Sequence, residues 1–466
     1  MSHGDGGSTA NRKWDVCAVL ATALALRISF PLFALAVAQP EPQFREPDTE
    51  GYLRVADEWL KTGRFAVGGE AEIVRTPGYP LLLMPGIAVG HVEAITIGLQ
   101  SLLACLSVWL AYRTSLAVFG NRTIALTAAW LLACEPISII YASKLLSETL
   151  FTTCVASACC LLASYASSRR WRELIAAAIV VSVAAYVRPI AYFLPLWVAL
   201  ALVVVGWRQV SDRKRLCLQA LAFAGLSMAL LVPWQVRNWL AVGYAGFSAI
   251  SDVNLYYYEA LPVLAEQQGI GPAQRNRARV EAGETDLSKY LRQHPEQADW
   301  PAARRYRFLR QQASEIIRTH PLAWMQLHFA GVVHTLTDSG RNAWLSFFGI
   351  PSANPEPARG TPTLWRRLTN AASQRPLVLA VHALLAAVLL VYLTLAAVGV
   401  GGALQNRAAL LILAVAIYLL LLSGGDAGYH RFRLPLTPII CTFAARGYCS
   451  ISGRLRLTYC VARKGS

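Results

Sequence analysis

The sequence predicts an all-α polytopic membrane protein, a bundle of about 10 transmembrane helices within a range of about 9–12. Hydrophobic residues make up 55% of the 466 residues and charged residues only 15%, a balance typical of membrane proteins. Apolar runs long enough to cross a hydrocarbon core of roughly 30 Å recur along the chain, separated by short stretches rich in Arg and Lys. This composition excludes a water-soluble globular protein.

The apolar runs form ten predicted spans, and the basic residues lie in alternate connections between them. The spans lie near 16–38, 99–118, 124–142, 149–166, 174–187, 190–205, 216–233, 377–398, 408–423 and 434–450. The basic connections are 113–122, 167–172, 207–215 and 406–407, together with the C-terminal tail. By the positive-inside rule this side is cytoplasmic, so we expect both termini in the cytoplasm.

The first span, Val16–Ala38, ends in small residues that resemble a signal-peptidase site. It is longer than the apolar core of a typical signal peptide and contains Arg27 and Pro31. We therefore expect an uncleaved anchor, with cleavage as the alternative that mass spectrometry of the N-terminus would decide.

The apolar stretch at 75–90 is left out of the span count. Its three prolines and three glycines would leave backbone groups unsatisfied in lipid, so it is predicted to be a re-entrant or interfacial segment. The opposite face then carries two large loops, at about 39–98 and 234–376. The chain divides accordingly into a transmembrane module at 1–233, the loop at 234–376, and C-terminal helices with a basic cytoplasmic tail at 377–466.

The second loop is predicted to form helices that lie on the membrane. Apolar residues recur at helical spacing from Ala302 to Arg318, among several arginines. The run at 322–350 is interrupted by polar residues, which favours interfacial helix pieces over a span.

The net charge of +16 favours membrane lipids as partners and not nucleic acid. The basic residues lie in short clusters beside apolar runs, where anionic headgroups would meet them, and no basic-aromatic face is evident. The 10 cysteines lie in or near the predicted spans, so no disulfide framework is expected.

Charged residues of both signs gather at the outer ends of the predicted spans. Carboxylates beside guanidiniums suit transfer from a sugar phosphate, because an acid can deprotonate the acceptor while cations stabilise the departing phosphate. The set consists of Asp48, Glu50, Arg75, Lys144, Glu148, Arg188, Arg237, Asp426, His430, Arg431 and Arg433.

Five segments carry a family resemblance. They are EPDTEGYLRVADEWLKTGRF with RTPGYPLLL, ASKLLSETLF, YVRPIAYFLP, VPWQVRNW and YHRFRLPLTP. Together they resemble the GT-C superfamily of polyprenyl-phosphate-sugar-dependent glycosyltransferases. The likeness is to the bacterial protein-mannosyltransferase and lipid A aminoarabinose-transferase group (glycosyltransferase family 39/83-like). It spans most of the chain, with the segments in the family's order.

The resemblance implies a function and a site. The expected enzyme moves a hexosyl or pentosyl group from an undecaprenyl-phosphate or similar donor to an extracytoplasmic lipid, glycan or protein acceptor, with inversion, in a bacterial inner or cell membrane. Asp48 would be the general base, with Glu148 as the second catalytic acid. Phosphate binding is assigned to Arg75, Lys144, Arg188, Arg431 and Arg433, and substrate binding to Tyr52, Tyr79 and Glu50.

Two positions depart from the family pattern. Many members carry a second acid directly after the first, whereas here Thr49 follows Asp48 and Glu50 comes one place later. Glu148 stands where many relatives have Asp. No cofactor is certain: a divalent metal held by Asp48 and Glu148 is conceivable, although two carboxylates alone are an incomplete shell.

Other interpretations stay open at this point. Asp48 could cap the helix that begins near Thr49, Glu148 could cap its own helix, and the arginines could anchor headgroups. Glu135, inside a predicted span, is more simply structural. Rival functions are a transporter or flippase of lipid-linked sugars, a glycan ligase or polymerase, and a non-enzymatic scaffold.

Overall fold

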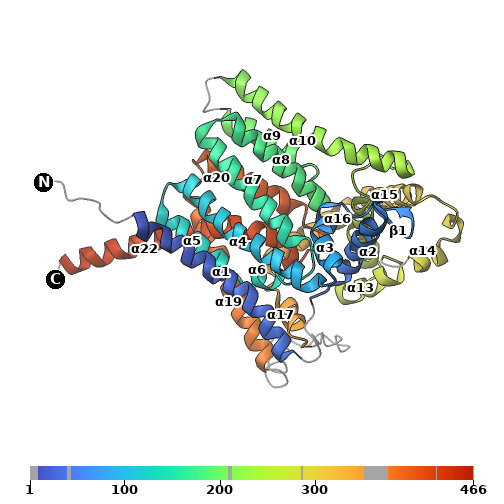
Figure 1. Ribbon diagram of the computed structural model, residues 1–466, viewed down its shortest axis with the longest axis horizontal. Coiled ribbons are helices and arrows are strands. Elements are labelled where there is room, and N and C mark those ends of the chain that lie inside the picture. The colour runs from blue at the N-terminus through green and yellow to red at the C-terminus, as the bar shows by residue number, and fades with distance from the viewer. Residues whose placement is uncertain are drawn as a thin grey trace.

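The computed structural model describes residues 9–38, 44–207, 212–284, 287–350, 376–426 and 428–464. Nearly all of its regular structure is helical, and one short hairpin pairs β1 (Ala66–Val67) with β2 (Glu70–Ala71). Helices that are far apart in sequence lie side by side in one bundle (Figure 1). The predicted fold class, an all-α polytopic membrane protein, is confirmed.

In the part of the chain that the structure describes, six helical segments are long and apolar enough to cross a membrane. They are Trp14–Val37, Val92–Phe119, Glu148–Ser168, Pro189–Gly206, Arg213–Val242 and Val378–Gly401. The helices that contain them are α1 (Thr9–Val37), α4 (Val92–Phe119), α7 (Glu148–Ser168), α9 (Leu194–Gly206) with the 3-10 turn η1 (Pro189–Ala191), α10 (Arg213–Val242) and α19 (Pro376–Gly401).

The four remaining predicted spans also contain helices of the bundle. They are α5 (Arg122–Ala133), α8 (Trp171–Val187), α20 (Arg407–Leu421), and α22 (Thr437–Lys464), which follows α21 (His430–Arg433) and η4 (Leu434–Leu436). The largest hydrophobic cluster lies between α7, α8, α9, α10 and α20.

The predicted span at 124–142 is broken in two. After α5 the chain kinks, and Pro136 begins a second helix, α6 (Pro136–Tyr141), with Glu135 as its N-cap. The Glu135 carboxylate accepts from the Ser138 N–H at 2.5 Å. Buried Arg27 of α1 fills the break: its guanidinium donates to the Ala133 carbonyl at 3.1 Å and the Ser138 hydroxyl at 2.8 Å. These hydrogen bonds offset part of the cost of burying two ionisable residues.

The first outer loop carries α2 (Pro47–Thr62), the hairpin and α3 (Gly78–Val89). The predicted re-entrant stretch is thus a helix of only 12 residues, too short to cross. Gly78 lets α3 start against the end of α8, because a Cβ there would lie 2.8 Å from the Tyr186 carbonyl oxygen.

The second outer loop is a series of short helices. They are α11 (Ile250–Asn254), the π-helix η2 (Leu255–Ala260), α12 (Leu261–Gln267), α13 (Pro272–Glu281), α14 (Leu287–Gln293), η3 (Pro295–Gln297), α15 (Ala302–Thr319), α16 (Pro321–Thr337) and α17 (Arg341–Phe347). The helix expected at Ala302–Arg318 is α15, and the run at 322–350 forms two pieces, α16 and α17.

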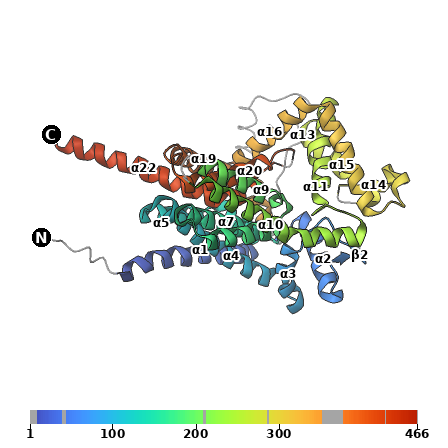
Figure 2. The ribbon, with the colours of Figure 1, turned by 90° about the horizontal axis from the view of Figure 1, so that it is seen from above.

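The two ends of the bundle differ in character. In Figures 1 and 2 the start of α1 and the end of α22 lie at one end, and α2 and α13–α16 lie at the other. At the first end Asp15 pairs with Arg122 at 2.8 Å, and the Asn406 side chain donates to the Val118 carbonyl at 2.7 Å. Segments predicted to share one membrane face therefore do meet.

Candidate active site

Asp48 lies in the first turn of α2. Pro47 begins the helix, Glu46 is its N-cap, and the Thr49 hydroxyl accepts from the Glu46 N–H at 2.9 Å. The same hydroxyl donates to the Leu145 carbonyl at 2.9 Å, which ties α2 to the start of α7. Asp48 is therefore not the helix cap, and its carboxylate is directed to other partners.

Both carboxylate oxygens of Asp48 accept from arginines. Arg75, which precedes α3, donates to Oδ1 at 3.0 Å, and Arg431 of α21 donates to Oδ2 at 2.7 Å. The side chain of Asp48 is 36% exposed, so it can still meet a substrate.

Glu148 is the first residue of α7, and its side chain is only 1% exposed. Its Oε1 accepts from both Arg188, at the end of α8, and Arg431. Its Oε2 is buried and has no hydrogen-bond partner among the described residues. Glu148 is thus the centre of an ion-pair network and does not reach toward solvent.

Arg431 joins the two acids, because its Nη1 donates to Asp48 and its Nε to Glu148. Aromatic rings flank the other two arginines: Arg75 lies 4.6 Å above the Tyr52 ring centroid, and Arg188 lies 5.6 Å from that of Phe432. The cluster holds three guanidiniums against two carboxylates, so it is suited to an additional anion.

The arginines decide the protonation of Asp48. Its partial burial would raise the pKa of the carboxyl, but the charges and hydrogen bonds of Arg431 and Arg75 outweigh that effect and hold the pKa well below its usual range. Asp48 is therefore a carboxylate at neutral pH.

Two predicted tyrosines lie beneath the cluster. The rings of Tyr52 and Tyr79 meet edge to face with centroids 4.9 Å apart, and the Tyr52 hydroxyl lies 3.3 Å from that of Ser147. The Tyr79 hydroxyl donates to the Gln100 side chain at 3.0 Å. Tyr79 is fully buried, so in this structure it supports α2 from below.

Three predicted site residues have partners outside the cluster. Lys144 is buried and pairs with Glu46. Glu50 points to the surface and pairs with Arg45 at 3.1 Å. Arg433 donates to the Thr335 and Asp338 carbonyls, each at 2.8 Å, at the C-terminal end of α16.

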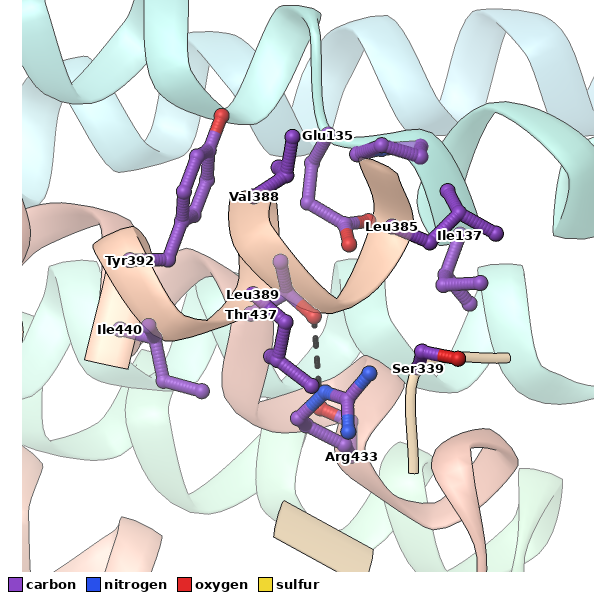
Figure 3. Close-up of a pocket in the computed structure, with 11 residues that line it drawn as sticks. Glu135, Ile137, Ser339, Leu385, Val388, Leu389, Tyr392, Arg433, Thr437 and Ile440 are labelled. Atoms are coloured by element: carbon purple, nitrogen blue, oxygen red, sulfur yellow. Dashed lines mark hydrogen bonds between the residues drawn. The ribbon is translucent and has the colours of Figure 1, made fainter. Parts of the chain in front are cut away.

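Arg433 also lines a cavity behind the cluster. Figure 3 shows Glu135 and Arg433 on opposite sides of it, with Leu385, Val388 and Leu389 of α19 forming an apolar wall. No ion pair joins these two charged residues among the described contacts. The cavity is separate from Asp48 and Glu148, neither of which lines it.

Sequence reasoning missed several residues of the cluster. Ser147 bonds both Tyr52 and Arg188, and the Tyr429 hydroxyl accepts from Arg431 at 3.4 Å. Both residues lie beside predicted site residues within the family-like segments. Neither side chain carries a charge, and the predicted site was based on charged residues at the outer ends of the spans.

The residues present do not fit a divalent metal in this arrangement. No group of three or more His, Cys, Asp and Glu side chains in the described part of the chain could hold an ion. Asp48 and Glu148 are separated by the guanidinium of Arg431, and a metal would have to displace it.

Comparisons with known proteins agree with this architecture. The family model of dolichyl-phosphate-mannose-protein mannosyltransferase matches residues 74–234. No curated protein matches the sequence at a significant level.

Several solved structures resemble this chain at low sequence identity. The oligosaccharyltransferase AglB of Archaeoglobus fulgidus, in complex with an inhibitory peptide and a dolichol-phosphate, is 13% identical with a TM-score of 0.50 over 98% of this chain and 52% of its own. The same enzyme tethered to an acceptor peptide is 14% identical with a TM-score of 0.52, over 97% of this chain and 51% of its own. ArnT of Cupriavidus metallidurans, bound to undecaprenyl phosphate, is 13% identical with a TM-score of 0.40, over 95% and 78%.

The chain therefore spans about half the length of the AglB structures. Their likeness extends over almost all of this chain at low identity, which makes it a likeness of fold. With the family model it confirms the resemblance that the sequence motifs predicted. The protein has the membrane fold of the GT-C glycosyltransferases, and its residues 74–234 match their protein-mannosyltransferase family.

Proposed function

We propose that the protein is a glycosyltransferase that moves a sugar from a polyprenyl-phosphate donor to an acceptor on the extracytoplasmic face of the membrane. The observation that carries this proposal is the bridge of Arg431 between Asp48 and Glu148, with a further arginine on each acid. The match to the mannosyltransferase family supports the same chemistry.

In the proposed reaction Asp48 is the general base. It takes the proton of the acceptor hydroxyl or amine while the acceptor atom attacks the anomeric carbon. The bond from that carbon to the phosphate oxygen breaks, polyprenyl phosphate leaves with the electron pair, and the anomeric configuration inverts. Arg75, Arg188 and Arg431 neutralise the departing phosphate, as preorganised cations in a partly desolvated site can.

In this arrangement Asp48 can act as the base only after the donor has bound. Two guanidiniums bonded to Asp48 make it a weak base in the free protein. A donor phosphate that draws Arg75 and Arg431 toward itself would release the carboxylate and raise its pKa. We therefore expect ordered binding, with the donor before the acceptor.

Replacing Asp48 tests this assignment. Asp48→Asn keeps the shape of the side chain but removes the base, so the transfer rate should fall by about 100-fold or more. Binding of polyprenyl phosphate, measured directly with the purified protein, should persist. Asp57→Asn on the exposed side of the same helix, where Asp57 pairs with Lys61 at 2.7 Å, is the matched control. Unimpaired transfer by Asp48→Asn would overturn the role of Asp48.

The donor and acceptor can be identified in cells. A deletion strain should accumulate one polyprenyl-phosphate sugar and lack the same sugar on a lipid, glycan or protein. Mass spectrometry of lipid-linked sugars and of these acceptors measures both. If neither changes, the proposed donor class is wrong.

A further inference from the structure

A chain of three side chains lies directly beside Arg431, with Tyr141 and His430 buried and Asp338 partly exposed. His430 Nδ1 is 2.6 Å from Oδ2 of Asp338, and His430 Nε2 is 3.1 Å from the hydroxyl of Tyr141. The three residues come from α21, from the turn between α16 and α17, and from the end of α6. The chain thus connects the second outer loop to the segment that leads into Glu148.

Two backbone N–H groups hold the carboxylate of Asp338 in place. Oδ1 of Asp338 accepts from the Gly340 N–H at 2.9 Å, and Oδ2 accepts from the His430 N–H at 3.2 Å. Gly340 has a φ of 75°, and a Cβ there would collide with the side chain of Ile137. Only glycine therefore fits this turn.

These partners define the state of the imidazole. Nδ1 faces a carboxylate and so carries the proton, which leaves Nε2 to accept from the Tyr141 hydroxyl. Burial lowers the pKa of His430, and Arg433 and Lys144 act in the same direction, while Asp338 opposes them. The ring of Tyr429 also packs on the imidazole, with centroids 5.1 Å apart. His430 is therefore neutral at physiological pH, with a hydrogen-bond partner on each nitrogen.

We propose that Asp338, His430 and Tyr141 are positioning residues that hold α21 so that Arg431 reaches both Asp48 and Glu148. Helix α21 has only four residues and cannot fix its own orientation. The chain holds it on one side of Arg431, and the bonds of Arg433 to the end of α16 hold it on the other. This inference adds to the proposed function, and its catalytic consequence rests on it.

The proposal predicts that substitutions of His430 and Glu148, which share no hydrogen bond, have coupled effects on the melting temperature. If His430 positions Arg431, its loss weakens the contact of Arg431 with Glu148. Glu148→Gln should then lower the melting temperature of the purified protein much less in a His430→Ala background than in the wild type. This double-mutant cycle of melting temperatures requires no transferase activity, so it tests the positioning of Arg431 separately from the proposed function.

His328 provides a matched control. It is a partly buried histidine of the second outer loop, its Nδ1 lies 3.1 Å from the Glu259 carboxylate, and none of the described contacts joins it to Arg431. His328→Ala combined with Glu148→Gln should give additive changes in melting temperature. Additivity for His430→Ala as well, or equal coupling for both histidines, would overturn the proposal.

A conservative variant guards against misfolding. The side chain of His430→Asn is shorter than histidine. Its amide N–H can still donate to Asp338, but its amide oxygen does not reach the Tyr141 hydroxyl, so this variant should restore part of the coupling that His430→Ala loses. Where transfer is measurable, His430→Ala should lower kcat by about 10-fold, and His430→Asn should recover part of that loss. Coupled melting temperatures in a protein that transfers no sugar would refute the proposed function alone. Transfer without coupling would refute the positioning chain alone.

Discussion

At the scale of single residues, the site is governed by how its charges are shared. Among the described residues, the carboxylates of Asp48 and Glu148 accept hydrogen bonds from arginines alone, and Arg431 donates to both. Three guanidiniums held close together would repel one another if the carboxylates did not separate them. The two acids therefore hold the three guanidiniums in place, in addition to the catalytic role proposed for them.

The depressed pKa of Asp48 predicts a pH-dependent contribution to stability. A carboxyl whose pKa is lower in the folded than in the unfolded state stabilises the fold above its unfolded pKa, near 3.9, and loses that contribution as the pH falls toward the folded pKa. The melting temperature of Asp48→Asn should thus lie below that of the wild type at pH 7. This difference should shrink below about pH 4. A difference that stays constant with pH would argue against the ion pairs.

The family-like segments allowed most of the acid and arginine cluster to be predicted. Asp48, Arg75, Glu148, Arg188 and Arg431 do meet. Sequence places a residue at the outer end of a helix, but not on a particular face of it. Lys144 pairs with Glu46, and Arg433 donates to the Asp338 carbonyl. Phosphate binding by these two residues therefore remains a prediction that their contacts in this structure do not support.

At the scale of elements, Arg75 depends on a gap in the surface of α2. Gly51 provides it, since a Cβ at this position would lie 3.1 Å from Nη2 of Arg75 and 3.2 Å from its Nε. Gly51→Ala should push the flexible guanidinium away from Asp48 while leaving the helix intact. We expect the transfer rate to fall by about 10-fold with little change in melting temperature. Gly98→Ala, in α4 with open space around it, is the control.

The contact between α19 and α22 depends on two glycines that face each other. A Cβ on Gly399 would collide with the backbone at Phe443, and one on Gly447 would collide with the backbone at Leu395. Such small residues let membrane helices approach closely. Gly399→Val should destabilise the fold by about 1–3 kcal/mol through overpacking. Gly401→Val in the same helix, with nothing nearby, should be tolerated, and thermal unfolding in detergent distinguishes the two.

The break between α5 and α6 shows what periodicity misses. An apolar run of the right length predicts one continuous span, and Pro136 alone does not require a break. The decisive partner, Arg27, is more than a hundred residues away and donates to the carbonyl groups at the end of α5. Tertiary contacts of this kind are not visible in a local pattern.

At the scale of the whole molecule, the two outer loops are joined by hydrogen bonds. Ser248 of the second loop donates to the Val74 carbonyl at 2.6 Å, and the Ala249 N–H donates to the Ile73 carbonyl at 2.8 Å. Arg237, one of the charged residues predicted at the outer ends of the spans, donates to the Glu72 carbonyl at 2.5 Å. The first and second outer loops, which the boundary predicted at 233 separates, thus contact each other. The sequence predicted the loops but not this packing, which depends on backbone contacts.

The orientation of the molecule in the membrane can be tested directly. The positive-inside rule alone assigns the site to the extracytoplasmic face. Lys61, exposed at the end of α2, and Arg172, exposed at the start of α8, belong to opposite predicted faces. In a variant without native cysteines, Lys61→Cys should react with a membrane-impermeant maleimide in right-side-out vesicles. Arg172→Cys should react only after the vesicles are opened. Because all spans are connected in series, the reverse pattern would turn the entire bundle over and place Asp48 in the cytoplasm, where the proposed extracytoplasmic acceptor could not reach it.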